Sequence, residues 1–230
     1  PGIPCADFGA NGEIRIETGM PLEWPGEFQI TSAPVIISDT VIVGSAIADN
    51  RRVEAPPGTV RAFDARTGRP RWAFDPLAHN GVIAGHANVW APMSVDEERG
   101  LVFLPTSSPG PDFWGGKRPG NNDYANSVVA LRAETGERVW SYQTVHHDVW
   151  DYDLPAQPTL ARIDTGAGPR DVVIQPTKQG FVFVLDRDTG TIWLLLTWNR
   201  GDDHESDIIA QRSRDTRRVF VDQLATLQAD

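Results

Sequence analysis

One short segment, residues 143–155, concentrates side chains that could bind a metal ion or move a proton. Two histidines precede Asp148, Asp151 and Asp153 in this segment. Carboxylates this close together can hold Ca²⁺ through their oxygens while one of them acts as a general base. A cation beside a carboxylate keeps it ionised at neutral pH, which suits abstraction of a hydroxyl proton. The alternative is that these residues satisfy the backbone of a loop, and spacing alone leaves both interpretations open.

Two further polar sites follow predicted strands. Asp49 and Asn50 end the apolar run 41–48, and Lys178 stands at the end of another strand-like segment. An Asp-Asn pair after a strand is usually a turn, and a lysine there is usually a surface residue. On residue type alone, neither site indicates a ligand.

Several other kinds of chemistry are excluded or unsupported. The chain lacks the Gly-X-Ser-X-Gly elbow that carries a serine nucleophile. It also lacks the phosphate-binding Gly-rich loop that ends in Gly-Lys-Ser/Thr. Its single cysteine, Cys5, cannot form an internal disulfide or a multi-cysteine zinc site. His79 and His86 have no cysteine or glutamate near them and are expected to be exposed to solvent. The net charge of −10 argues against a protein that coats nucleic acid, because phosphate contacts need clustered Lys and Arg.

The composition predicts the elements that must position these groups. The 230 residues include 21 Gly, 18 Pro and 8 Trp, and short apolar segments alternate with turn residues throughout. That pattern is typical of many short antiparallel strands. No apolar run approaches the ~20 residues of a membrane-spanning helix, since the strongest, 191–198, is far shorter. We therefore predict an all-β protein with no membrane span in this chain.

An internal repeat sharpens that prediction. Residues 62–72, 130–140 and 184–193 each contain a strand, a Thr-Gly turn and a second strand that begins near a Trp. The Gly supplies a positive φ at the turn, and the Trp can pack against a neighbouring unit. Such repeats are typical of propeller blades or of another solenoid-like array. The plainer alternative is a set of ordinary hairpins that share a turn type.

Ordered matches along residues 1–193 give a family resemblance. The chain resembles the quinoprotein dehydrogenases that use pyrroloquinoline quinone (PQQ), most closely their glucose-dehydrogenase-like branch. Its Thr-Gly…Trp repeat is similar to the blade-docking motif of that family. The matching segments are Thr31-Ser32-Ala33-Pro34, residues 44–50, Asn88-Val89-Trp90-Ala91-Pro92, residues 111–116 and residues 144–158.

The resemblance implies a fold and a cofactor. The family fold is an eight-bladed β-propeller of four-stranded blades, so this chain is expected to hold about three blades of a partial propeller. PQQ and a divalent metal, Ca²⁺ first and Mg²⁺ second, are expected in the central funnel. Asp151 matches the catalytic carboxylate, and Asp49, with Asn50 beside it, matches the metal-binding position. Ser108 stands where many alcohol-oxidising relatives have a metal-binding Asn, which argues against a metal ligand there.

Three residues match the cofactor contacts of the family. Trp90 matches the indole on which PQQ stacks, Lys178 the lysine that bonds the quinone oxygens, and Thr31 a threonine that bonds a cofactor carboxylate. The implied activity is oxidation of a sugar or polyol hydroxyl, with electrons passed to a quinone or cytochrome acceptor. The implied location is the periplasm, although the chain carries no signal peptide.

The C-terminal residues do not continue the pattern. We predict a partial propeller over 1–193 and a divergent tail over 194–230, helical in part or disordered. With about three of eight blades, the isolated chain is expected to bind PQQ weakly and to turn over poorly. The alternatives are a non-catalytic propeller-type binding module and an inactive fragment.

Overall fold

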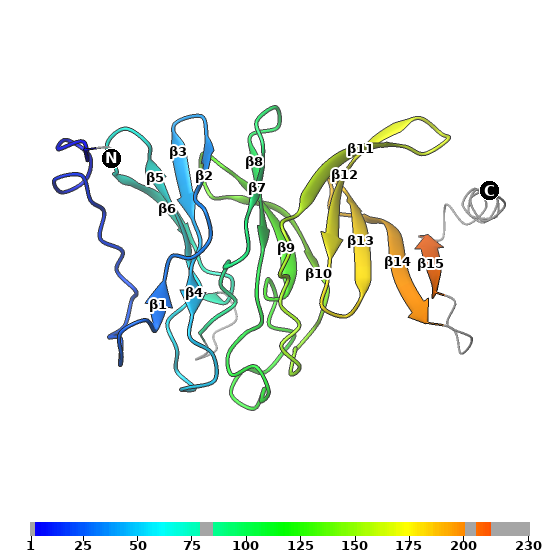
Figure 1. The fold of residues 1–230 in the computed structure, drawn as a ribbon, viewed down its shortest axis with the longest axis horizontal. Coiled ribbons are helices and arrows are strands. Elements are labelled where there is room, and N and C mark those ends of the chain that lie inside the picture. The colour runs from blue at the N-terminus through cyan, green and yellow to red at the C-terminus, as the bar shows by residue number, and fades with distance from the viewer. Residues whose placement is uncertain (1–2, 79–84, 201–205, 213–230) are drawn as a thin grey trace.

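The computed structural model describes residues 3–78, 85–200 and 206–212. Within these ranges the chain forms strands and turns and contains no α-helix, in agreement with the all-β prediction. Three antiparallel sheets stand side by side in chain order, as Figure 1 shows from left to right. They are consecutive blades of a propeller, each made by one stretch of sequence.

Each blade is a meander of neighbouring strands, apart from one short excursion in the first. The first sheet holds β2 (Val35–Ile37), β3 (Thr40–Val43), β5 (Val60–Asp64) and β6 (Pro70–Phe74). The second holds β7 (Ser94–Asp96), β8 (Leu101–Pro105), β9 (Ser127–Arg132) and β10 (Arg138–Gln143). The third holds β11 (Thr159–Asp164), β12 (Pro169–Pro176), β13 (Phe181–Asp186), β14 (Ile192–Arg200) and β15 (Ser206–Arg212). A separate pair joins β1 (Phe28–Gln29) to β4 (Ala46–Ile47).

The first part of the predicted tail is extended in the structure. Strand β14 continues through Arg200, and residues 206–212 pair with it as β15. The reason lies in the register, which sets Leu194, Leu195 and Leu196 opposite the apolar residues of β13. Cross-strand apolar pairs favour an extended chain over a helix at these positions. Residues 213–230, on which the rest of the prediction falls, lie outside the described residues.

The repeated Trp residues join one blade to the next. The Trp72 indole Nε1 donates to the carbonyl of Ala133 at 2.9 Å, and Trp140 donates to the carbonyl of Arg187 at 3.0 Å. In the second joint the ring lies against the turn glycine of the next blade, Gly190, whose φ is +69°. A Cβ on that glycine would lie 2.4 Å from a Trp140 ring atom. The turn therefore needs glycine for its conformation and for the close approach of the ring.

The middle blade is buried on both faces. Successive side chains of a strand point to opposite sides, so Val102 and Leu104 pack toward the first blade while Leu101 and Phe103 pack toward the third. All four are at most 3% exposed. Two apolar layers therefore fix the three sheets relative to one another and hold the ends of their strands in place.

The strands of these sheets have two functionally different ends. The turn end comprises the short connections 38–39, 97–100 and 133–137. The loop end comprises the long connections 44–59, 85–92, 106–126 and 144–158, which leave the opposite ends of the same strands. Long insertions in a compact fold commonly carry function, and here the blades bring them together.

Candidate active site

A cavity of about 330 Å³ opens at the loop end, between segments of all three blades. We call it the acidic cavity. Its lining includes five residues that the sequence singled out and six further polar residues. The five are Thr31, Asp49, Trp90, Asp151 and Lys178; the six are His86, Asn88, Ser107, Ser108, Asp112 and Asp153. Asn50 does not line the cavity but is hydrogen-bonded to Asp112, which does.

Asp151 lies in the cavity beside a lysine. Lys178 Nζ donates to the Asp151 carbonyl at 2.9 Å and lies 3.2 Å from its carboxylate Oδ2. The Asp151 backbone has a φ of +59°, a conformation that side-chain-bearing residues rarely adopt and that clusters at functional sites. Burial, together with the nearby Asp153 carboxylate, raises the pKa of Asp151 against the opposing effect of Lys178. A carboxylate with a raised pKa is a stronger base than an exposed one.

Asp153 contacts both Trp90 and Lys178, which are predicted to bind the cofactor. Its Oδ2 accepts a hydrogen bond from the Trp90 indole at 3.1 Å and lies 3.2 Å from Lys178 Nζ. Its Oδ1 accepts from the backbone N–H of Ser108 at 2.6 Å. Although burial opposes it, the Asp153 and Asp151 carboxylates raise the pKa of Lys178, so the ammonium stays charged. The carboxylate therefore fixes the indole ring and the ammonium on one wall of the cavity.

Asp148 supports the loop that carries Asp151. Its carboxylate is buried and accepts the backbone N–H groups of Trp150 at 2.9 Å and Tyr152 at 2.6 Å, the two neighbours of Asp151. The Ser108 hydroxyl donates to the same carboxylate at 2.7 Å. These bonds satisfy the backbone of a tight loop and hold its left-handed residue in place. They also engage the Ser108 hydroxyl proton.

A second cluster also lines the cavity. His86 Nδ1 lies 3.3 Å from Asp49 Oδ1, and Asp112 completes a group whose potential ligand atoms all lie within 4.8 Å of one another. His86 is only 2% exposed, so the expectation that it is a solvent-exposed histidine is wrong. Burial is the main cause that raises the pKa of Asp112 to about 6; His86 opposes the rise, and the neighbouring carboxylates, first Asp49, add to it.

The donor set of the cavity fits a cation and a flat polar cofactor. Four carboxylates face a single lysine, so the folded chain holds an excess of negative charge that a divalent cation would neutralise. Trp90 is half-buried and offers a ring whose orientation is fixed, which suits stacking. The volume lies at the lower end of the ~300–1,000 Å³ range of small-molecule sites. The charge, the indole and the volume of the cavity therefore fit a bound PQQ and metal ion.

Comparisons with known proteins agree with this fit. The PQQ family model, described as "Glucose/ethanol/alcohol dehydrogenase, beta-propeller domain", matches residues 1–194. The chain belongs to the PQQ-dependent dehydrogenase family. The members of this family are oxidoreductases. One relative of this chain is the quinoprotein glucose dehydrogenase of Escherichia coli, which is 41% identical over 83% of this chain and 25% of that protein. The quinate/shikimate dehydrogenase (quinone) of Acinetobacter baylyi is 43% identical over 82% of this chain and 25% of its own length.

A solved quinoprotein dehydrogenase gives the same fold. The crystal structure of a quinohemoprotein alcohol dehydrogenase from Comamonas testosteroni matches with a TM-score of 0.66 and 26% identity, over 80% of this chain and 32% of that chain. The curated relatives are longer, and this chain spans about a quarter of their length. Among its described residues, none belongs to a helix that is long and apolar enough to cross a membrane.

Sequence reasoning missed part of this site. It gave no separate role to His86, Asp112 or Asp153, which stand in three different loops of the loop end. One signal was available for Asp112, because it lies in a segment, 111–116, that carries the family resemblance. The convergence of the three residues could be seen only once the blades were packed together.

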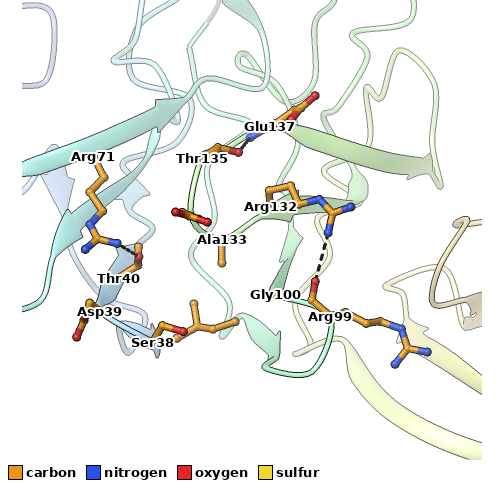
Figure 2. Close-up of a pocket in the computed structure, with 12 residues that line it drawn as sticks. Ser38, Asp39, Thr40, Arg71, Arg99, Gly100, Arg132, Ala133, Thr135 and Glu137 are labelled. Carbon is orange, nitrogen blue, oxygen red and sulfur yellow. Dashed lines mark hydrogen bonds between the residues drawn. The ribbon is translucent and has the colours of Figure 1, made fainter.

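A larger cavity of about 640 Å³ lies at the turn end, against the first two blades. Figure 2 shows Arg71 bonded to Thr40, Arg132 bonded to the Arg99 carbonyl, and the Arg99 side chain pointing away from the other labelled residues. Arg71 donates to Thr40 and Asp64 at 2.7 Å each. Arg99 binds Asp171 and Asp188 at 2.8 Å each, on the third blade. This turn-end cavity is lined mainly by the short connections 38–39, 97–100 and 133–137, and we assign it a structural role in the fold.

Proposed function

We propose that the acidic cavity is the site at which a sugar or polyol hydroxyl is oxidised with PQQ, with Asp151 as the general base. The observation that carries the proposal is the joint placement of Asp151, Lys178 and the Asp153-bound Trp90 in one cavity. A protein that used its blades only as a scaffold would have no need of this arrangement. The proposal deepens the family assignment, which by itself extends only to PQQ-dependent oxidation of alcohols or sugars.

Four of the chain's residues would hold the cofactor and its metal. Trp90 would stack against the ring system of PQQ, while Lys178 and the exposed Thr31 would bond its polar groups. When bound, PQQ supplies the acceptor for the hydride that leaves the substrate carbon. Asp49 would hold a divalent cation, with Ca²⁺ first and Mg²⁺ second as candidates.

Asp151 would remove the proton of the substrate hydroxyl. Its carboxylate lies at the cavity wall and is partly shielded from water, which raises its pKa and its basicity. Lys178 holds the carboxylate oxygen Oδ2 at 3.2 Å and so fixes the direction in which the base points. A positioned base of this kind contributes roughly 10²–10⁴-fold to a proton-transfer step.

The proposed substrate class, electron acceptor and location are inferred from the relatives. Their names include glucose and quinate or shikimate, all of which carry ring hydroxyls, and this supports a sugar or polyol as the substrate class. The electrons would pass to a quinone or a cytochrome, and the location would be the periplasm. Because the chain spans about a quarter of these relatives, we expect weak PQQ binding and slow turnover from the chain alone.

The proposal is tested by reduction of PQQ in a single turnover. The purified chain is loaded with PQQ and Ca²⁺, mixed with glucose or glycerol, and followed by the absorbance of the quinone. We expect slow reduction that falls about 10²–10⁴-fold in Asp151→Asn and is unchanged in Glu134→Gln, at the turn end. An Asp151→Asn variant that keeps the full rate would overturn the role of the base. A folded chain that shows no PQQ binding would instead favour a binding module.

A further inference from the structure

We propose that Arg118 is a positioning residue for the general base, because its buried guanidinium joins the loop 106–126 to the loop that carries Asp151. The inference rests on the proposed function for the role of Asp151, and it adds a residue that does not line the acidic cavity. Arg118 acts through the backbone of Asp148. Part of the test is made on the chain without PQQ, so the two proposals can fail separately.

Arg118 has an unusual environment for an arginine. It is 0% exposed and is the largest of the fully buried side chains among the described residues. Arginine is rarely buried to this degree unless its charge and its N–H groups are paired. The residue lies in the loop 106–126, which connects β8 to β9. The partners of the buried guanidinium therefore show what this side chain holds in place.

The guanidinium binds three acceptors in two loops. Its Nη1 donates to the Asn122 side-chain Oδ1 at 2.7 Å, and its Nη2 donates to the Pro111 carbonyl at 3.0 Å. The same Nη2 also donates to the carbonyl of Asp148, in the loop that carries Asp151. The Asn122 amide returns a hydrogen bond from its Nδ2 to the Arg118 carbonyl at 2.9 Å. The planar fork of an arginine reaches acceptors in different directions, which the compact ammonium of a lysine does less well.

Arg118 also balances the charge of Asp148. Burial lowers the pKa of Arg118, and the carboxylates of Asp148 and Asp112 oppose this effect. Asp148 is itself only 1% exposed, so its carboxylate needs a nearby cation as well as hydrogen bonds. Lys178, the lysine of the acidic cavity, is paired with other carboxylates. Arg118 is therefore the cation that supports the Asp148 carboxylate.

The hydrogen bonds of Asp148 extend this constraint to Asp151. The Asp148 carboxylate accepts the backbone N–H groups of Trp150 and Tyr152, on either side of Asp151. The left-handed backbone of Asp151, with a φ of +59°, persists only where the surrounding structure holds it. Because Arg118 binds the Asp148 carbonyl, these bonds start from a residue that is fixed to the loop 106–126. Removal of the guanidinium should let the turn relax and displace the Asp151 carboxylate in the cavity.

The first measurement is amide hydrogen exchange, followed by NMR on the full chain without PQQ. Arg118→Met keeps a long side chain but removes its N–H groups and its charge. We expect exchange at Trp150 and Tyr152 to accelerate at least ~10-fold, since their bonds to Asp148 open more often. Arg118→Lys keeps the charge without the fork and should give a smaller change. The control is Lys117→Met, which removes a positive charge from an exposed neighbour in the same loop and should leave exchange unchanged.

The second measurement separates positioning from stability. In a single turnover with saturating glucose, the rate at which bound PQQ is reduced should fall about 10–100-fold in Arg118→Met, because the base is displaced. The affinity for PQQ should change less than about threefold, since Trp90 and Lys178 are unaltered. Arg118→Lys should recover part of the rate. A residue needed only for folding would lower the folded fraction without changing the rate of the folded, loaded chain.

Two results would overturn the proposal. One is unchanged exchange at Trp150 and Tyr152 in a folded Arg118→Met, and the other is a full rate of PQQ reduction in that variant. If Arg118→Met does not fold, Arg118→Lys decides in the same way, because it keeps the buried charge. No PQQ reduction by the unaltered chain would contradict the proposed function, and the exchange at the two amides would then decide whether Arg118 fixes the loop.

Discussion

The turn-end cavity and the acidic cavity are lined from opposite ends of the same strands, but their charges are paired differently. At the turn end, Arg71 pairs with Asp64 of its own blade, and Arg99 contacts Asp96 of its own blade and Asp171 and Asp188 of the next. At the loop end, four carboxylates share one lysine and one histidine. The first arrangement is complete in the folded chain, whereas the second leaves an excess of negative charge.

The difference shows that volume is a poor guide to function in this fold. The turn-end cavity is about twice as large, yet most of its residues belong to the short connections between neighbouring strands. The acidic cavity combines buried carboxylates, left-handed backbones at His86 and Asp151, and raised carboxyl pKa values. Clustered perturbed groups of this kind mark functional sites more reliably than size does. Changes at the turn end should therefore alter stability, and changes at the loop end should alter binding.

The largest stability effect is expected from the joint between the second and third blades. Trp140 is 5% exposed and packs on Phe103 and the turn of the third blade. Trp140→Ala should lower the free energy of unfolding by about 3–5 kcal/mol, because it removes a large buried ring. Trp150→Ala, which changes an exposed indole at the loop end, is the matched control and should cost less than about 1 kcal/mol. Urea unfolding measures both, and equal losses would contradict the role of the joint.

An intermediate effect is expected from Asp112 in the metal-free chain. Its folded pKa, about 6, lies above its ordinary value of 3.8, so the folded state binds the proton more tightly than the unfolded state. The free energy of unfolding should therefore fall as pH rises from about 4 to about 6, by on the order of 2–3 kcal/mol. Asp112→Asn should remove this part of the pH dependence. Urea unfolding at several pH values checks it, and identical pH profiles for the two proteins would contradict it.

A smaller effect separates two glycines of the turn end. Gly136 (φ +73°) and Gly100 (φ +66°) share a left-handed backbone, but a Cβ on Gly136 would lie 2.7 Å from the Trp72 ring while Gly100 is open. Gly100→Ala should cost about 1 kcal/mol from backbone strain, and Gly136→Ala about 1–3 kcal/mol more from the displaced ring. Thermal or urea unfolding of both variants gives the difference. Equal costs would mean that the ring does not need the glycine.

The repeated motif made the fold predictable. The three Thr-Gly…Trp copies predict blades because each element of the motif has a local reason, a turn that needs glycine or an indole that needs a neighbour. The start of the tail was less predictable, because the pairing of β14 with β13 and β15 depends on contacts between strands that helical spacing does not record. Local patterns therefore give the blades but not their extent.

The site was predictable only in part, for a related reason. Asp49, Trp90, Asp151 and Lys178 were found through the resemblance and do line one cavity, although their roles stay predictions. His86 was expected to be exposed because its sequence neighbours carry no ligand-type side chains. Its partners, Asp49 and Asp112, come from other loops, and no periodicity within one segment reports such a meeting.

The most direct test of the account is whether PQQ binds at the acidic cavity. The folded chain is titrated with PQQ by calorimetry in the presence of Ca²⁺ or Mg²⁺, and Lys178→Met is compared with Glu134→Gln. The account predicts weak, saturable binding that depends on the cation, falls about tenfold or more in Lys178→Met, and is unchanged in Glu134→Gln. No binding by the folded chain, or equal binding by Lys178→Met, would contradict it.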